Sequence, residues 1–79
     1  MRKGRVREVL EMMLWKPEED PSDYEIIFVS RGAPGDLEIV KGDQVRLWRD
    51  RLILSDGREI PLHRVVEVRR RGTPLYSRP

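Results

Sequence analysis

Residues 52–60 read Leu-Ile-Leu-Ser-Asp-Gly-Arg-Glu-Ile, and this stretch decides the fold class because it predicts an antiparallel hairpin. An Asp-Gly pair suits the two positive-φ positions of a type I′ turn, which joins antiparallel strands through a two-residue loop. With Asp56 and Gly57 as that loop, the predicted pairs are Ser55 with Arg58, Leu54 with Glu59 and Ile53 with Ile60. Pro61 then ends the pairing, because proline has no backbone N–H to donate to a ladder.

Downstream of the hairpin the sequence predicts one more strand, followed by a turn that reverses the chain. Residues 65–71 are expected to form a strand with Val66 and Val68 facing inward, because alternate residues of a strand share a face. Gly72 then turns the chain towards residues 75–78.

Upstream of the hairpin three strands are predicted. In one of them Val45 and Leu47 alternate with a basic outer face that carries Arg46 and Trp48, and the strand is expected to extend as far as Leu52 at most. Residues 37–40 form a short strand between two turns. Residues 24–31 are expected to form a central strand, because their middle is apolar on both faces.

Residues 4–16 predict the one helix, and Pro17 ends it. Its apolar stripe follows the 3.6-residue period of an amphipathic helix and consists of Val6, Val9, Leu10, Met13 and Leu14. Residues 17–23 are expected to form a loop. The predicted fold class is therefore α+β, with the N-terminal helix packed on a curled antiparallel sheet of about five strands. The pattern leaves open whether the sheet closes into a small barrel.

The composition limits the class of protein. With 79 residues the chain makes one small domain, residues 1–79, and it contains no cysteine and one histidine. Disulfide frameworks, thiol nucleophiles and cysteine- or histidine-rich metal sites are therefore excluded, and we expect no cofactor. No apolar run approaches the roughly 18 residues of a membrane span, and no secretory signal is visible. The sequence predicts a cytoplasmic protein that does not contact a membrane.

The charges are unevenly distributed. Five of the 14 acids lie in residues 18–25, which hold no cation, so the rest of the chain carries 16 cations against 9 acids. Thirteen of the 16 cations are arginine, whose planar guanidinium suits phosphate. This composition indicates binding to RNA or another polyanion. Surface ion-pair networks of the kind found in thermophilic proteins are the alternative.

His63 and Arg64 are the most informative candidates for a binding site. Residues 60–65 read Ile-Pro-Leu-His-Arg-Val, which places an imidazole beside a guanidinium directly after a proline and a leucine. Both groups donate hydrogen bonds, and together they suit one anion such as a phosphate. The alternative is a structural histidine with a solvated arginine.

Arg31 and Gly32 form a second candidate. They open a turn with two glycines and a proline, and glycine lets backbone N–H groups approach a phosphate closely. The alternative is an ordinary turn.

Three aromatic side chains are candidates for stacking on a base. Trp48 lies between two arginines and is the better exposed candidate, whereas Trp15 is expected to be core or half-core beside Leu14. Tyr76 lies near the end of the chain.

Two basic tracts are candidates for contact with an RNA backbone, with solvated surface as the alternative. They consist of Arg2, Lys3, Arg5 and Arg7 at the start of the predicted helix, and of Arg69, Arg70 and Arg71 with Arg78 near the end. Cations oppose the dipole at a helix N-terminus, so a docked phosphate would stabilise the first tract.

Three segments carry a family resemblance. They are Leu14-Trp15-Lys16-Pro17, Val29-Ser30-Arg31-Gly32-Ala33 and Glu59-Ile60-Pro61-Leu62-His63-Arg64-Val65-Val66-Glu67-Val68. In this order, followed by Gly72 and Tyr76-Ser77-Arg78, they resemble the RNA cyclic group end recognition domain, a family of small, largely uncharacterised archaeal proteins. The Ile-Pro-x-His-Arg block is the most specific part.

The resemblance implies recognition of RNA ends that bear a 2′,3′-cyclic phosphate. It points to His63 and Arg64, to Arg31 with Gly32, and to Trp15. The sequence departs from the family pattern at Leu62, where an aromatic residue is common, and at Lys16, where an acid is common. The first departure argues against stacking at position 62.

The sequence therefore predicts an RNA-binding module involved in RNA processing. One alternative is a structural component of a ribonucleoprotein such as the archaeal ribosome. A second is a cyclic phosphate hydrolase, but that chemistry usually needs two acid–base groups, and the sequence offers one histidine, His63. We therefore expect the protein not to be an enzyme.

Overall fold

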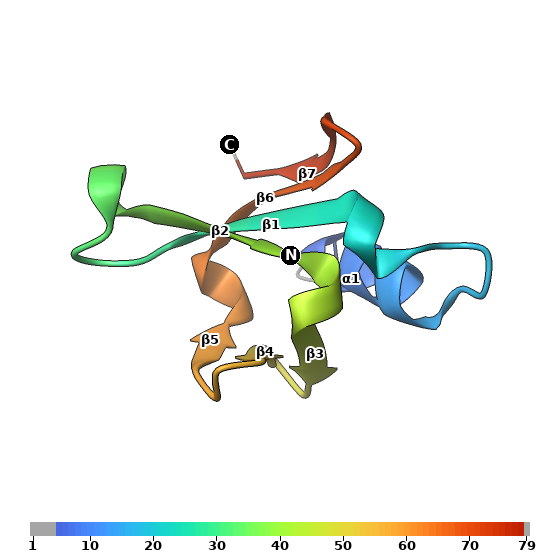
Figure 1. The fold of residues 1–79 in the computed structure, drawn as a ribbon, viewed down its shortest axis with the longest axis horizontal. Coiled ribbons are helices and arrows are strands. Elements are labelled where there is room, and N and C mark those ends of the chain that lie inside the picture. The colour runs from blue at the N-terminus through green and yellow to red at the C-terminus, as the bar shows by residue number, and fades with distance from the viewer. Residues whose placement is uncertain (1–4, 79) are drawn as a thin grey trace.

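A computed structural model describes residues 5–78 of the chain. Gly4, the predicted first helical residue, and Arg2 and Lys3 of the N-terminal basic tract lie outside the described residues. The elements are α1 (Arg5–Trp15), β1 (Tyr24–Val29), β2 (Leu37–Lys41), β3 (Val45–Trp48), β4 (Arg51–Leu54), β5 (Glu59–Pro61), β6 (Val65–Arg70) and β7 (Thr73–Ser77) (Figure 1). Across these residues no helix combines the length and the apolar character that a bilayer crossing requires.

The fold class is α+β, as predicted, but the strands number seven and form two antiparallel sheets. One sheet has four strands in the order β2-β1-β6-β7, and the other has three in the order β3-β4-β5 (Figure 1). The described strands do not close into a barrel. The strand predicted from Val45 ends at Trp48, before its outer limit at Leu52, because the chain turns at Arg49, whose φ is +58°, and continues as β4. Arginine does not favour a positive φ, so the only local signal for this turn is Asp50.

The core lies between α1 and the inner faces of the two sheets. The helix buries Val9, Leu10 and Met13, as its stripe predicted, while Val6 and Leu14 pack at the edge of the core. The largest fully buried side chains are Tyr24, Phe28, Leu10, Met13, Ile26, Leu52, Val65 and Val68. β1 is an interior strand, as its apolar sequence predicted.

The β4–β5 turn differs from the predicted type I′ turn by one residue. Leu54 N–H donates to Arg58 O at 2.8 Å and Gly57 N–H donates to Leu54 O at 2.9 Å, so the loop has three residues, with Gly57 at φ +93°. Leu52 therefore lies opposite Ile60, and Ile53 opposite Glu59. The predicted register would have paired Leu54, which is buried, with Glu59. The three-residue loop instead lets Leu52 and Ile60 share the buried face.

The prediction for β6 is correct for Val68 and wrong for Val66. Val65 and Val68 are buried, and Val66 is only half-buried. The pairing with β1 jumps from Glu67 to Val65, and this β-bulge shifts the inward face by one residue. The chain then reverses at Arg71 and Gly72, whose φ angles are +51° and +84°. The positive-φ pair of a type I′ turn thus lies here rather than at residues 56–57.

Candidate nucleic-acid interface

Half of the arginines in residues 5–78 have a carboxylate partner. The ion pairs are Arg7–Glu11, Arg51–Glu59, Arg58–Glu38, Arg69–Glu67, Arg70–Glu19 and Arg71–Asp23, with N–O distances between 2.6 and 3.2 Å. Within the same residues Arg5, Arg31, Arg46, Arg49, Arg64 and Arg78 have no carboxylate oxygen within 4.0 Å. A polyanion can use the second group without displacing a carboxylate of the described residues.

The predicted basic tract 69–71 belongs to the paired group. Its first arginine pairs within β6, and the other two pair with Glu19 and Asp23, at 3.2 and 3.0 Å. Both acids come from the acid-rich segment 18–25, which connects α1 to β1. Two arginines of the tract therefore pair with two acids of this segment in the fold, and contact of the tract with RNA stays a prediction.

The 3₁₀ turn η4 (Leu62–Arg64) connects β5 to β6 and carries the two main candidates. His63 and Arg64 are both exposed, whereas Leu62 packs against the core and Val65, which follows the turn, is buried. The apolar residues on either side thus anchor the turn and leave its imidazole and guanidinium facing solvent.

Arg78 joins these two residues. Its Nη1 donates to the carbonyl oxygen of His63 at 2.6 Å, and its backbone N–H donates to Val66 O at 2.8 Å. The pairing of β7 with β6 brings it there, because Ser77 lies opposite Glu67. The sequence predicted Arg78 only as part of a C-terminal tract. Counting pairs outward from Arg71–Gly72 could have placed it near residues 64–66. We call His63, Arg64 and Arg78 the η4 cluster.

The β3–β4 turn lies against η4. Leu62 N–H donates to Asp50 O at 2.9 Å, which joins the two turns directly. The preceding residue, Arg49, places its guanidinium carbon 5.4 Å from the centroid of the Trp48 ring. Arg7, on α1, donates from Nη1 to the Arg49 carbonyl oxygen. An exposed indole, at the end of β3, and a further arginine with no carboxylate partner among residues 5–78 therefore lie at the turn that contacts η4.

Arg31 and Gly32 lie in the turn between β1 and β2. Both are exposed, and Gly32 has a φ of +92°. The turn is closed by its own backbone, with Ser30 N–H donating to Asp36 O at 2.8 Å. In Figure 1 this green turn forms the outer tip of the β1–β2 hairpin, away from the body of the molecule. Within residues 5–78 no hydrogen bond or ion pair joins Arg31 to the η4 cluster.

The three aromatic candidates differ in exposure. Trp48 is 59% exposed, which confirms the expectation that it is accessible. Trp15 is 66% exposed, so the prediction of a core or half-core position is wrong. As the last residue of α1 it falls outside the buried stripe. Tyr76 is half-buried and packs against the core opposite Val68, so its ring is not a free stacking surface.

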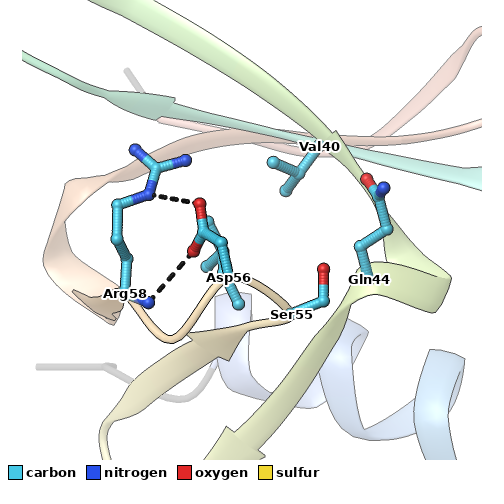
Figure 2. A pocket seen from close by; sticks show the side chains of 6 residues that line it. Val40, Gln44, Ser55, Asp56 and Arg58 are labelled. Atoms are coloured by element: carbon cyan, nitrogen blue, oxygen red, sulfur yellow. Dashed lines mark hydrogen bonds and ion pairs between the residues drawn. The ribbon is translucent and has the colours of Figure 1, made fainter.

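A pocket of about 280 Å³ lies on a different part of the surface, between β2 and the β4–β5 turn (Figure 2). Arg58, which lines it, donates from Nε to Asp56 at 2.9 Å and from its terminal nitrogens to Glu38 at 2.6 and 3.0 Å. Hydrogen bonds from Arg58 lower the pKa of both carboxyls. These groups satisfy one another, and none of the predicted binding residues lines this pocket. In residues 5–78 no three His, Asp or Glu side chains are grouped to hold a metal ion.

Comparison with known proteins supports the resemblance seen in the sequence. The family model described as the MJ1316 RNA cyclic group end recognition domain matches residues 1–78. The UPF0248 protein of Thermococcus onnurineus is 40% identical over 68 residues, 86% of this chain and 77% of its own length. UPF0248 protein MK0350 of Methanopyrus kandleri is 35% identical, over 84% of this chain and 89% of its own.

UPF0248 protein MJ1316 of Methanocaldococcus jannaschii is 34% identical over 75 residues, 92% of each chain. No solved structure matches significantly. Because the family model spans nearly the whole chain, this protein belongs to the MJ1316 RNA cyclic group end recognition domain family.

Proposed function

We propose that this protein is an RNA-binding module that recognises RNA ends bearing a 2′,3′-cyclic phosphate, and that the η4 cluster is its site. The observation that carries the proposal is the hydrogen bond of 2.6 Å from Arg78 to the His63 carbonyl oxygen. It gathers the single imidazole of the chain and two guanidinium groups that have no carboxylate partner among residues 5–78 at one exposed turn. The family description supplies the class of ligand.

The chemistry of this cluster suits a terminal cyclic phosphate. Such a group is a compact monoanion whose two free oxygens accept hydrogen bonds. Guanidinium groups donate charge-assisted bonds to phosphate oxygens, and an imidazole N–H can donate a further one. Because both Arg64 and His63 are exposed, an RNA end can reach them from solvent.

We also propose that the domain binds its RNA end without cleaving it. Opening a cyclic phosphate requires a base for the attacking water and an acid for the leaving oxygen. His63 is the only histidine of the chain, and the charged groups nearest to it in the cluster are arginines, which stay protonated. Membership of a ribonucleoprotein such as the archaeal ribosome stays a prediction.

The test compares one short single-stranded RNA with three different ends: a 2′,3′-cyclic phosphate, an open 3′-phosphate and a 3′-hydroxyl. We expect the wild-type protein to bind the cyclic end most tightly. The variant His63→Ala/Arg64→Ala should lose that preference, with affinity for the cyclic end falling about tenfold or more, as for the loss of hydrogen bonds to a charged group. The same samples, analysed for released 3′- or 2′-phosphate, test the absence of turnover.

Arg71→Gln is the matched control. It also removes an exposed arginine, but one that pairs with Asp23 at 3.0 Å on the acid-rich side of the molecule. We expect it to keep the preference for the cyclic end. Arg31→Ala tests separately the turn to which the family resemblance also points. Equal affinity of the wild-type protein for all three ends would overturn end recognition.

A further inference from the structure

The outer face of the β3–β4–β5 sheet has a regular arrangement that the proposed site does not use. Strand alternation turns Val45 and Leu47 towards the core, so Arg46 and Trp48 point outward. The strand registers place Trp48 in one row with Arg51 and Pro61. The next row on the same face contains Arg46, Ile53 and Glu59. An indole, a proline ring and an isoleucine thus share one open face.

The charges on this face leave two arginines available. The two carboxylates, Asp50 and Glu59, lie 3.7 and 2.7 Å from Arg51, so both pair with the same guanidinium. Arg46 and Arg49 have no carboxylate within 4.0 Å among residues 5–78. With Arg46, Arg49 and Arg51 against Asp50 and Glu59, the face combines an exposed indole with an excess of guanidinium groups, which complements a base attached to a phosphate backbone.

Trp48 is held in an orientation that suits stacking. The Arg49 guanidinium lies 5.4 Å from the ring centroid, within cation–π range. Arg7 of α1 donates a hydrogen bond to the Arg49 carbonyl oxygen, and this bond connects the turn to the helix. The indole remains 59% exposed, so Arg49 leaves most of its surface open.

This face is continuous with the η4 cluster. Pro61, the last residue of β5, leads directly into η4, and Leu62 N–H donates to Asp50 O at 2.9 Å. Only one residue, Arg49, separates Trp48 from Asp50, and His63 follows Leu62. The indole and two of the three members of the η4 cluster therefore start from backbone positions within two residues of this hydrogen bond.

We propose that the outer face of the β3–β4–β5 sheet is a platform for single-stranded RNA. Trp48 stacks on the base next to the phosphate bound by the η4 cluster, and Arg46 contacts a phosphate further along the strand. This inference rests on the proposed function and extends it from the terminal phosphate to the nucleotides that precede it. Neither Trp15 nor Tyr76 belongs to this platform, since Trp15 ends α1 and Tyr76 is half-buried on β7.

Tryptophan fluorescence tests the platform, because the chain has two tryptophans and both are exposed. Trp15→Phe leaves Trp48 as the only indole, and Trp48→Phe leaves Trp15. The probes are oligouridines of one to four nucleotides with a cyclic end, and the same RNAs with an abasic sugar at the stacked position. We expect the intact RNAs to quench Trp15→Phe and not Trp48→Phe. The affinity should rise with RNA length up to about three nucleotides. Each intact RNA should bind roughly 5- to 100-fold more tightly than the same RNA with the abasic sugar.

Trp48→Ala should weaken binding by a similar factor, whereas Trp48→Phe should retain most of the affinity because phenylalanine can still stack. Trp15→Ala is the control and should bind as the wild-type protein does. The unfolding midpoint of each variant is measured as well, so that a loss of affinity caused by unfolding can be recognised. Wild-type affinity of Trp48→Ala, with the cyclic preference still dependent on His63 and Arg64, would overturn the platform and leave the proposed function intact. Quenching of Trp48 that is equal for all RNA ends would support the platform and overturn end recognition.

Discussion

Tyr24 shows how one buried hydroxyl connects the acid-rich segment to the sheet. The side chain is fully buried, and its hydroxyl donates to Glu19 Oε1 at 2.8 Å. The same oxygen lies 3.2 Å from Arg70 Nε. Burial, together with the hydrogen bond to Glu19, raises the pKa of Tyr24 from 10.0 to about 12. The neutral phenol is therefore favoured in the folded state.

We expect the stability of the protein to decrease as the pH rises from about 10 to about 12. In this range the folded state keeps the Tyr24 proton and the unfolded state releases it, so a rise in pH favours unfolding. Below pH 10 this contribution is fully present. The measurement is the free energy of urea unfolding at several pH values, for wild type and Tyr24→Phe. The variant should show a smaller decrease across this range.

Tyr76→Phe is the control, because it removes the other tyrosine and leaves Tyr24 in place. It should retain the wild-type decrease. If Tyr24→Phe and wild type lost stability in parallel between these pH values, the assigned role of Tyr24 would be wrong.

The β4–β5 hairpin shows that a turn decides which face of a strand is buried. A two-residue loop would place Ile53 opposite Ile60, but the three-residue loop places Ile53 opposite Glu59. The absence of cysteine makes this register easy to test. We expect Ile53→Cys/Glu59→Cys to form an intramolecular disulfide readily under mild oxidation, because directly opposite residues of antiparallel strands have the short Cβ separation that a disulfide requires.

Ile53→Cys/Ile60→Cys is the matched control. These two side chains point to opposite faces of the sheet, and we expect at least tenfold slower cross-linking, measured by mass spectrometry after thiol alkylation. The reverse order of rates would favour the two-residue turn.

Over residues 5–78, the arginines fall into those that pair with a carboxylate and those that do not. The two groups should respond differently to salt. Most ion pairs of the described residues, unlike the more buried Arg70–Glu19 pair, lie at the surface, where pairs of this kind contribute little to stability and are screened. RNA binding through Arg46, Arg64 and Arg78 instead releases counterions. We therefore expect the logarithm of RNA affinity to fall with the logarithm of salt concentration with a slope of about −2 to −3. The unfolding free energy should change by less than about 1 kcal/mol over the same range.

Arg64→Ala/Arg78→Ala should make this slope shallower by about one unit or more, since each lost phosphate contact removes roughly 0.7 for single strands. Affinity is measured by fluorescence anisotropy from 50 to 500 mM salt, and stability by urea unfolding in the same buffers. A slope unchanged by the double substitution would show that other cations make the phosphate contacts.

Local patterns predicted much of the fold. The helical stripe identified Val9, Leu10 and Met13 as core, and the apolar run of β1 identified an interior strand. The errors occurred where the pattern was interrupted. The bulge beside Val66 and the turn at Arg49 do not follow from residue type, because each depends on the pairing of distant segments.

The sequence by itself determined the fold class, the family and the candidate His63-Arg64 pair, because strand alternation, helix period and short motifs are local properties of the chain. Only the tertiary structure decided which arginines are free. Residues 69–71 and 18–25 look like separate charged segments, yet the fold pairs Arg70 with Glu19 and Arg71 with Asp23. It also brings Arg78 to His63, fifteen positions away, because β7 pairs with β6. Charge neutralisation depends on distances of a few ångströms, and those distances arise only when the strands have paired.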